Sequence, residues 1–256
     1  MKTIAYYALH YGSEYLAWSV RSIQHCVDEI HFLYTDKPSF GVATTLVCPD
    51  TEERLIQEAH RFVAPGQHDK LFWHRVKAHG EGHHRDQLRT LAKDAQIVVH
   101  VDADEVWDEH ALMSAIAATR GTSHWSLRAR FLHFWRSFKW VCTDAAMPER
   151  FFNWQNSKHL GAGYLSPFLQ PVPVLHFGYA QSEALMRYKW QIHGHQAELR
   201  PGWFETQFLG WHPGDGDVHP TCRDGFWTPR ETSDDERAIL HNVLGDHPYF
   251  DLPIIR

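Results

Sequence analysis

The chain has 256 residues, a hydrophobic content of 43% and a formal net charge of -6 at pH 7. This length allows one large α/β domain or one domain with a substantial appendage, and the apolar share is enough for a full core. The acidic balance excludes a general attraction to nucleic acid or anionic membranes. No apolar stretch reaches membrane-spanning length and the N-terminus lacks a signal-peptide core, so we expect a cytoplasmic protein without a membrane span.

Strand and helix patterns alternate along the first half of the chain. Apolar β-branched runs predict strands, and apolar residues at helical spacing predict helices. The predicted strands are 3–8, 27–34, 44–47, 71–76 and 97–101, and the predicted helices are 14–26, 52–63 and 85–95. Such alternation indicates a mainly parallel sheet, here in a nucleotide-binding α/β half formed by residues 1–120. The absence of a G-x-G-x-x-G loop disfavours a Rossmann dehydrogenase and a P-loop enzyme.

The second half, residues 121–256, has a different texture and is expected to complete one compact domain. Residues 125–140 mix aromatic and basic side chains in a pattern that favours strands. A helix is predicted at 183–191, whereas 201–229 is rich in Gly, Pro, Trp and His and predicts irregular structure or an ordered lid. A capping box at Ser233-Asp234-Asp235-Glu236 predicts a last helix that ends before Gly245.

Cysteine and histidine spacings do not indicate a zinc site. Residues 79–84 (HGEGHH) superficially resemble a zinc-binding H-E-x-x-H helix, but their glycines and displaced glutamate disfavour that helix, and we interpret them as a loop. The cysteines form no C-x-x-C pair, and we expect reduced, structural thiols. They are Cys26, Cys48, Cys142 and Cys222.

The most informative segment is residues 97–107 (IVVHVDADEVW), in which an apolar strand ends abruptly in carboxylates. Ligands of open α/β sheets bind outside the carboxyl ends of the strands. Asp102 and Asp104 are two apart, so in an extended chain they point the same way and repel unless a cation lies between them. A divalent ion that also binds phosphate oxygens would fill this role. The alternative is a solvated turn in which Asp104 or Glu105 caps a short helix.

Several segments match one known family in the same order along the chain. They are YGSEYLAWSVRSI at 11–23, VDEIHFLYTD at 27–36, RDQLRTLAKDA at 85–95, VDADE at 101–105, PERFF at 148–152 and LHFGYA at 175–180, the last followed by RYK at 187–189. Over about residues 1–190 the chain thereby resembles the GT-A glycosyltransferases, in particular the inverting family 2 and its lipopolysaccharide-core-type branch. The resemblance implies a nucleotide-sugar-binding sheet, mainly parallel, with helices on both faces and here an aromatic-rich C-terminal extension.

The resemblance also implies a chemistry and a set of site residues. The enzyme would transfer a hexosyl or pentosyl group from a nucleotide diphosphate donor, expected to be a UDP-sugar, with Mn²⁺ or Mg²⁺ bridging the diphosphate. Asp104 and His176 would bind the metal ion, and Asp102 would bind the donor ribose, or the metal through water. Asp36 would face the base or ribose, and Arg85 would pair with phosphate as a bidentate donor. Divalent ion and arginine together would stabilise charge on the leaving diphosphate.

The catalytic base is the point at which the chain departs from the family. An inverting enzyme needs a carboxylate to deprotonate the acceptor hydroxyl. The family branch places a glutamate soon after its R-L-F element, but residues 157–161 here read SKHLG. The nearest acids are Asp144, Glu149 and Glu183, of which Glu149 is the candidate base. Inversion and retention of the anomeric configuration both stay open.

Several acceptors and other functions are compatible with the sequence. The acceptor could be a glycan, a lipid-linked sugar, a protein side chain or, in a phage setting, a hydroxymethylated DNA base. In the last case a DNA-facing strip would consist of Arg128, Arg130, Arg136 and Lys139, although such a run is more often packing under a small sheet. A non-catalytic nucleic-acid- or glycan-binding module on the same fold is the alternative. A sugar nucleotidyltransferase is disfavoured, because residues 6–13 lack a glycine-rich basic loop.

Overall fold

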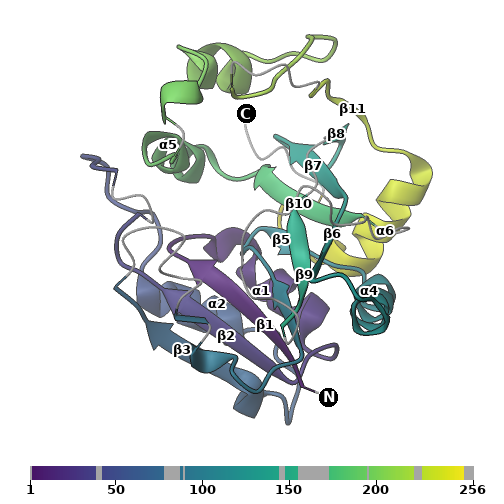
Figure 1. Cartoon of the computed structure of the whole chain (residues 1–256). Coiled ribbons are helices and arrows are strands. Elements are labelled where there is room, and N and C mark those ends of the chain that lie inside the picture. The colour runs from purple at the N-terminus through teal and green to yellow at the C-terminus, as the bar shows by residue number, and fades with distance from the viewer. Residues whose placement is uncertain are drawn as a thin grey trace.

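The structure is a computed structural model, shown in Figure 1, with two sheets and five named α-helices. It describes residues 2–38, 42–77, 87–88, 90–143, 148–154, 173–194, 196–221 and 227–250. The helices are α1 (Ser13–Ile23), α2 (Glu52–His60), α4 (Glu109–Gly121), α5 (Glu183–Gln191) and α6 (Asp234–Leu244). The strands are β1 (Thr3–Leu9), β2 (Glu29–Tyr34), β3 (Leu71–Arg75), β4 (Ile97–His100), β5 (Glu105–Val106), β6 (Ser126–Arg128), β7 (Phe131–Trp135), β8 (Trp140–Thr143), β9 (Glu149–Asn153), β10 (Val174–Tyr179) and β11 (Arg230–Glu231).

The larger sheet, sheet A, has the strand order β3-β2-β1-β4-β9-β6 and is mostly parallel. Strand β1 pairs in parallel with β2 and β4, and β2 pairs in parallel with β3. Strand β9 is antiparallel to both of its neighbours, β4 and β6. The predicted α/β fold with a mainly parallel sheet is confirmed, and sheet A contains strands from both halves of the chain.

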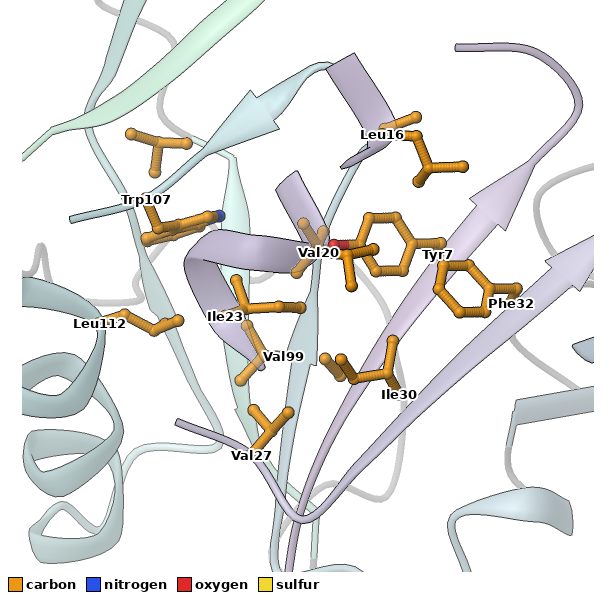
Figure 2. Close-up of a cluster of buried hydrophobic side chains, with 14 of the residues drawn as sticks. Tyr7, Leu16, Val20, Ile23, Val27, Ile30, Phe32, Val99, Trp107 and Leu112 are labelled. Atoms are coloured by element: carbon orange, nitrogen blue, oxygen red, sulfur yellow. The ribbon is translucent and has the colours of Figure 1, made fainter. Parts of the chain in front are cut away.

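Helical segments cover both faces of sheet A, because successive side chains of its buried strands point to opposite sides. On one face Tyr7 of β1 and Phe32 of β2 pack with α1, α2 and α4 in the main core cluster. Figure 2 shows Leu16 and Val20 of α1 in this cluster. On the other face a second cluster contains Leu88, from the segment whose described residues 87–88 and 90–91 are helical.

The smaller sheet, sheet B, has the order β11-β8-β7-β10-β5 and lies above sheet A in Figure 1. Strand β10 is parallel to β7 and antiparallel to β5. Side chains of β7, β8 and β10 pack in an aromatic layer formed by buried tryptophan and phenylalanine rings. Members of this layer are Trp135, Trp203, Phe204, Phe208, Trp211 and Trp227. The strands predicted within residues 125–140 are therefore confirmed as β6 and β7.

Two predicted elements differ from the structure. Residues 44–47 form no strand; Leu46 is 41% exposed and Val47 88% exposed, because β2 pairs with β3 and offers this apolar run no sheet edge. Residues 201–229 are not irregular throughout, because Phe204–Leu209 forms a π-helical turn whose Phe204 and Phe208 enter the aromatic layer.

The other predicted elements within the described residues keep their places, with ends that lie within three residues of the predicted bounds. The exception is the predicted helix 85–95, whose start lies outside the described residues and whose helical part ends at residue 91. In α6 the Ser233 hydroxyl accepts from the Glu236 amide and the Glu236 carboxylate accepts from the Ser233 amide, which confirms the capping box. Cys26, Cys48 and Cys142 are free thiols in the described part of the chain. No helix among the described residues combines the length and apolar character needed to cross a membrane.

Candidate active site

The carboxyl ends of the parallel strands of sheet A meet at one edge. His10 follows β1, Asp36 follows β2, and Asp102 follows β4. Strand β9 runs in the opposite direction, so it begins at this same edge and brings Arg150 to it. Residues 101–104 then lead from β4 in sheet A directly into β5 of sheet B. This acidic loop therefore lies where the two sheets meet.

A glycine allows the loop after β1 to approach the acidic loop closely. Gly12 has a φ of 124°, and a Cβ atom at this position would lie 2.5 Å from the Cβ of Ala103. The amides of Gly12 and Ser13 donate to Asp50 Oδ2 over 2.7 and 3.0 Å, and the Ser13 hydroxyl also donates to Asp50. Asp50 thus occupies the amino end of α1, which would otherwise attract an anionic ligand.

Gly12→Ala is expected to lower the free energy of unfolding by more than backbone strain alone. Strain of this kind costs about 1–3 kcal/mol. The matched control is Gly214→Ala, because Gly214 has a φ of 99° and a Cβ atom added to it would meet nothing within 4 Å. Urea denaturation of both variants measures the difference. Equal losses of unfolding free energy would show that the clash between the added Cβ atom and Ala103 does not contribute to the destabilisation.

Arg150 lies between two of the three acids. Its Nη2 donates to Asp102 Oδ2 and to Glu105 Oε1, each over 2.6 Å, and its Nε donates to Glu105 Oε1 over 2.9 Å. The guanidinium also lies 5.0 Å from the centre of the Phe131 ring. Glu105 is fully buried and Arg150 is 7% exposed. The positive group that Asp102 requires is therefore supplied by the chain itself.

Burial and charge act in opposite directions within this ion cluster. Burial raises the pKa of Asp102, but Arg150 and His100 outweigh it and hold that pKa well below its usual range. For Glu105, burial together with the charges of Asp102 and Asp104 outweighs Arg150 and raises the pKa well above the usual value. Coupled acids whose pKa values are driven apart in this way hold different charges over a wide pH range.

Asp104 lies in a second group of polar side chains, and it is 8% exposed. Its Oδ2 accepts from Gln181 Nε2 over 2.8 Å and from Lys189 Nζ over 3.3 Å. Its Oδ1 lies 3.7 Å from His176 Nε2 on β10, which is too far for a hydrogen bond. The backbone carbonyl of Asp104 accepts from the Phe177 amide over 2.8 Å, which fixes the acidic loop against β10.

His176 is held as a neutral imidazole with one nitrogen directed toward Asp104. Its Nδ1 lies 2.8 Å from Nδ1 of His133, so one ring must donate and the other accept. Burial lowers the pKa of His176 to about 4, although the charge of Asp104 acts to raise it. Gly178 makes room for this ring, because a Cβ atom there would lie 2.4 Å from His176 Cε1.

Asp104 and His176 fit a divalent ion as a pair of ligands. A carboxylate oxygen and a neutral imidazole nitrogen both suit Mn²⁺, and a hydrogen bond on the other ring nitrogen is typical of metal-ligating histidines. The described part of the chain contains no group of three His, Cys, Asp or Glu side chains that could hold a metal. The remaining coordination positions would be left to a bound ligand and to water, which is the usual arrangement for Mg²⁺ in proteins.

Helix α5 lies beside the site, and hydrogen bonds of His10 link it to the ends of β1 and β2. His10 Nδ1 donates to the carbonyl of Thr35 over 2.8 Å, and its Nε2 lies 2.7 Å from the Tyr188 hydroxyl. The Tyr11 ring meets the Tyr188 ring edge-on, with centroids 6.1 Å apart. Burial, and then the charges of the two aspartates Asp104 and Asp102, raise the pKa of Tyr11, so its phenol is neutral.

The other candidate residues lie in different surroundings. Asp36 is exposed at the end of β2, and Arg85 lies outside the described residues, as do residues 79–84 and 157–161. Glu149 accepts from the Ser126 hydroxyl over 2.6 Å at the start of β9. The capping alternative for Asp104 or Glu105 is wrong, because Asp108 caps α4 by accepting from the Ala111 amide.

Two of the four residues of the predicted DNA-facing strip, Arg136 and Lys139, have side-chain contacts within the chain. Arg136 Nη1 donates to the carbonyl of Trp211 over 2.8 Å, and its own φ of 56° turns the chain after β7. Lys139 Nζ lies 3.2 Å from Glu231 Oε1 on β11. For these two residues the contacts favour packing around the aromatic layer over a DNA-facing role.

Sequence reasoning missed four side chains that complete the site. Arg150, Lys189, Gln181 and His133 received no role from their local patterns, and each meets its acid or imidazole partner across a long stretch of sequence. Arg150 and Asp102 are 48 residues apart, and Lys189 and Asp104 are 85 residues apart.

Comparison with known proteins gives similarity to solved structures alone. No protein-family model matches the chain, and no curated protein matches it. It is similar to residues 1–349 of TarS from S. aureus, with 15% identity over 54% of this chain and 36% of that one, at a TM-score of 0.30. It is also similar to glucosyl-3-phosphoglycerate synthase from Mycobacterium tuberculosis, in complex with Mn²⁺, UDP and phosphoglyceric acid. That match has 18% identity over 53% of this chain and 43% of the other, at a TM-score of 0.30. The chain thus spans less than half the length of either protein.

Proposed function

We propose that the chain is a glycosyltransferase of the GT-A type that transfers a sugar from a nucleotide diphosphate donor to an acceptor hydroxyl. The observation that carries this proposal is the delivery of Asp102 and Asp104 by a buried central strand to the carboxyl edge of a parallel sheet. Arg150, His176 and Lys189 converge on these acids. Ligands of open α/β sheets bind at this edge, and a cationic group beside carboxylates suits a metal-bound diphosphate.

The proposed roles follow from exposure and charge. Asp104 and His176 would hold Mn²⁺ or Mg²⁺, which would offset charge on the departing diphosphate. The Asp102 side chain is 37% exposed and ionised beside Arg150, so it can accept from ribose hydroxyls. Asp36, exposed at the end of β2, is the second proposed donor contact.

The transfer itself needs a base for the acceptor hydroxyl. The acceptor oxygen forms a bond to the anomeric carbon, the bond to the diphosphate oxygen breaks with its electron pair, and the acceptor proton passes to a carboxylate. Glu149 is the proposed base, because it lies next to Arg150 at the same sheet edge. The proposed donor is a UDP-sugar carrying a hexose or pentose, and the proposed acceptor is a glycan hydroxyl or the hydroxyl of a hydroxymethylated DNA base.

Asp104→Asn is expected to weaken nucleotide binding by at least about 10–100-fold, because loss of even an outer partner of a metal ligand lowers metal affinity by that factor. The test is calorimetry of UDP, GDP and CDP with and without Mn²⁺. The wild type should bind one of them tightly only with Mn²⁺, and the variant should lose that dependence. Asp69→Asn, at an exposed position remote in the fold, is the matched control.

Two results would contradict this proposal. Failure of the wild type to bind any of the three nucleotides would leave the acidic loop without the proposed ligand. DNA binding that weakens strongly with salt, again without nucleotide binding, would support the non-catalytic binding module instead.

A further inference from the structure

Helix α5 places Lys189 beside the acidic loop, although Lys189 and Asp104 are 85 residues apart in the sequence. The helix begins at Ser182, whose hydroxyl accepts from the Leu185 amide and whose own amide donates to Glu14 Oε2 over 2.9 Å. Leu185 is buried, and Lys189 follows it by one helical turn on the same face. This face is directed at the core, so the lysine side chain is carried inward rather than into solvent.

The Lys189 ammonium has a defined position. It donates to Asp104 Oδ2 over 3.3 Å and to the carbonyl of Gly178 over 3.0 Å, and it lies 5.6 Å from the centre of the Tyr179 ring. A Cβ atom on Gly178 would approach the ammonium to 3.1 Å. The glycine that makes room for the His176 ring therefore also makes room for this ammonium.

The two cations of the site differ in what they can still contact. Arg150 directs its guanidinium to Asp102 and Glu105 and is 7% exposed. An ammonium has three N–H donors, and Lys189 directs two of them to Asp104 and Gly178. Its side chain is 19% exposed, so a ligand at the sheet edge can reach it. Of these two cations, Lys189 is the one placed to meet an anionic ligand.

Asp104 divides its two oxygens between different partners. Oδ2 faces Lys189, whereas Oδ1 faces His176 Nε2, which is the position proposed above for the metal ion. A diphosphate that enters between Asp102 and Asp104 brings several negative charges to a group that already holds three carboxyl side chains. A metal ion at Oδ1 would offset part of this charge, and an ammonium at Oδ2 would offset more of it on the other side.

We propose that Lys189 is a phosphate-binding residue, which donates its third N–H to an oxygen of the donor's diphosphate. Asp104 and Gly178 hold the ammonium in place for this contact. This inference rests on the proposed function, and it adds a protein cation to the metal ion as the second positive partner of the diphosphate. The ligand class is a nucleoside diphosphate or its sugar conjugate.

The experiment compares Lys189→Gln with the wild type at saturating Mn²⁺, so that changes in metal affinity do not affect the result. The probes are the nucleoside diphosphate that the wild type binds, by calorimetry, and the corresponding nucleoside, by ligand-observed NMR. We expect diphosphate affinity to fall at least about 10-fold, as for loss of a charge-assisted hydrogen bond, with nucleoside affinity unchanged. Lys189→Arg should restore part of the affinity, because it keeps the charge.

The control is Lys139→Gln, which removes a lysine that pairs with Glu231 at an exposed position. Unchanged diphosphate affinity in Lys189→Gln would overturn the inference while leaving the glycosyltransferase proposal intact. Equal losses for diphosphate and nucleoside would also overturn it, because they would indicate a purely structural ion pair with Asp104. Absence of diphosphate binding by the wild type would instead overturn the proposed function, and the inference with it.

Discussion

Replacement of Arg150 by methionine is expected to lower the free energy of unfolding by about 3–5 kcal/mol at pH 7, the cost of breaking a buried ion pair from one side. Methionine keeps an apolar stem of similar length and removes the guanidinium that lies over the Phe131 ring, so the loss reports chiefly on charge. Without the guanidinium, Asp102 and Glu105 would be left close together, with Glu105 fully buried. Urea denaturation of the wild type and the variant measures the effect.

The pH dependence of this loss has a definite sign. In the wild type the pKa of Asp102 lies below its unfolded value, so its stabilisation is present above that value and is lost as pH falls, whereas the raised pKa of Glu105 acts in the opposite direction. In the variant the acids favour their protonated forms, so the variant recovers as pH falls and the difference between the proteins shrinks. Adding Glu105→Gln to Arg150→Met should restore part of the stability at pH 7.

Arg237→Met is the matched control for the loss of an arginine, because its partner Asp234 is exposed and such surface pairs contribute about 0–1 kcal/mol. A loss for Arg150→Met no larger than that of this control would show that the three-residue ion cluster does not stabilise the fold.

Acidification from pH 7 to pH 4 is expected to lower the free energy of unfolding by about 3 kcal/mol through His247 alone. Its Nδ1 accepts from the Tyr249 amide over 3.1 Å, and its Nε2 donates to the carbonyl of Glu14 over 3.0 Å, which requires a neutral ring. Burial lowers the pKa of His247 from 6.5 to about 4. Between about pH 6.5 and pH 4 the unfolded chain therefore binds a proton at His247 that the folded chain does not bind. The free energy of unfolding falls as the pH decreases through this range.

His247→Gln tests this assignment by urea denaturation at pH 7, 6, 5 and 4. The variant is expected to be less stable at pH 7, because the ring also stacks on Tyr15, but to lose about 3 kcal/mol less than the wild type on acidification. His124→Gln, at an exposed position, serves as the control. His176, whose pKa burial also lowers to about 4, should leave part of the acid sensitivity in place. An unchanged pH dependence in His247→Gln would contradict the assignment.

The sequence predicted the parts of the fold that depend on local periodicity. The apolar strand before Asp102 and the helix 183–191 each follow from the pattern of consecutive residues, and the structure contains both as predicted. Residues 44–47 show the limit of this reasoning, because a short apolar run becomes a strand only where a sheet edge is available to it. That edge is a property of the tertiary structure, as is the choice of Asp108 over Asp104 as a helix cap.

The polar contacts of the site were harder to predict, because each depends on which strands and helices become neighbours. Two signals were nevertheless present in the sequence. Arg150 directly precedes two phenylalanines in a strand, and an arginine on a buried strand needs an acidic partner. Lys189 lies four residues after the apolar Leu185, which places it on the inward face of its helix. Neither signal identifies the partner, which becomes visible only when β9 pairs with β4 and when α5 brings Lys189 to Gly178 of β10.

The acidic loop has a mechanical consequence because it joins two sheets. Residues 101–104 connect β4 to β5, and four residues span at most about 14 Å. Strand β5 is also the edge strand of sheet B, so the rest of that sheet and its aromatic layer extend away from this joint. Residues 129–130, between β6 of sheet A and β7 of sheet B, form a second short link between the sheets. The carboxylates thus lie on one of the covalent links between the two sheets, so a displacement of either sheet would also displace the carboxylates.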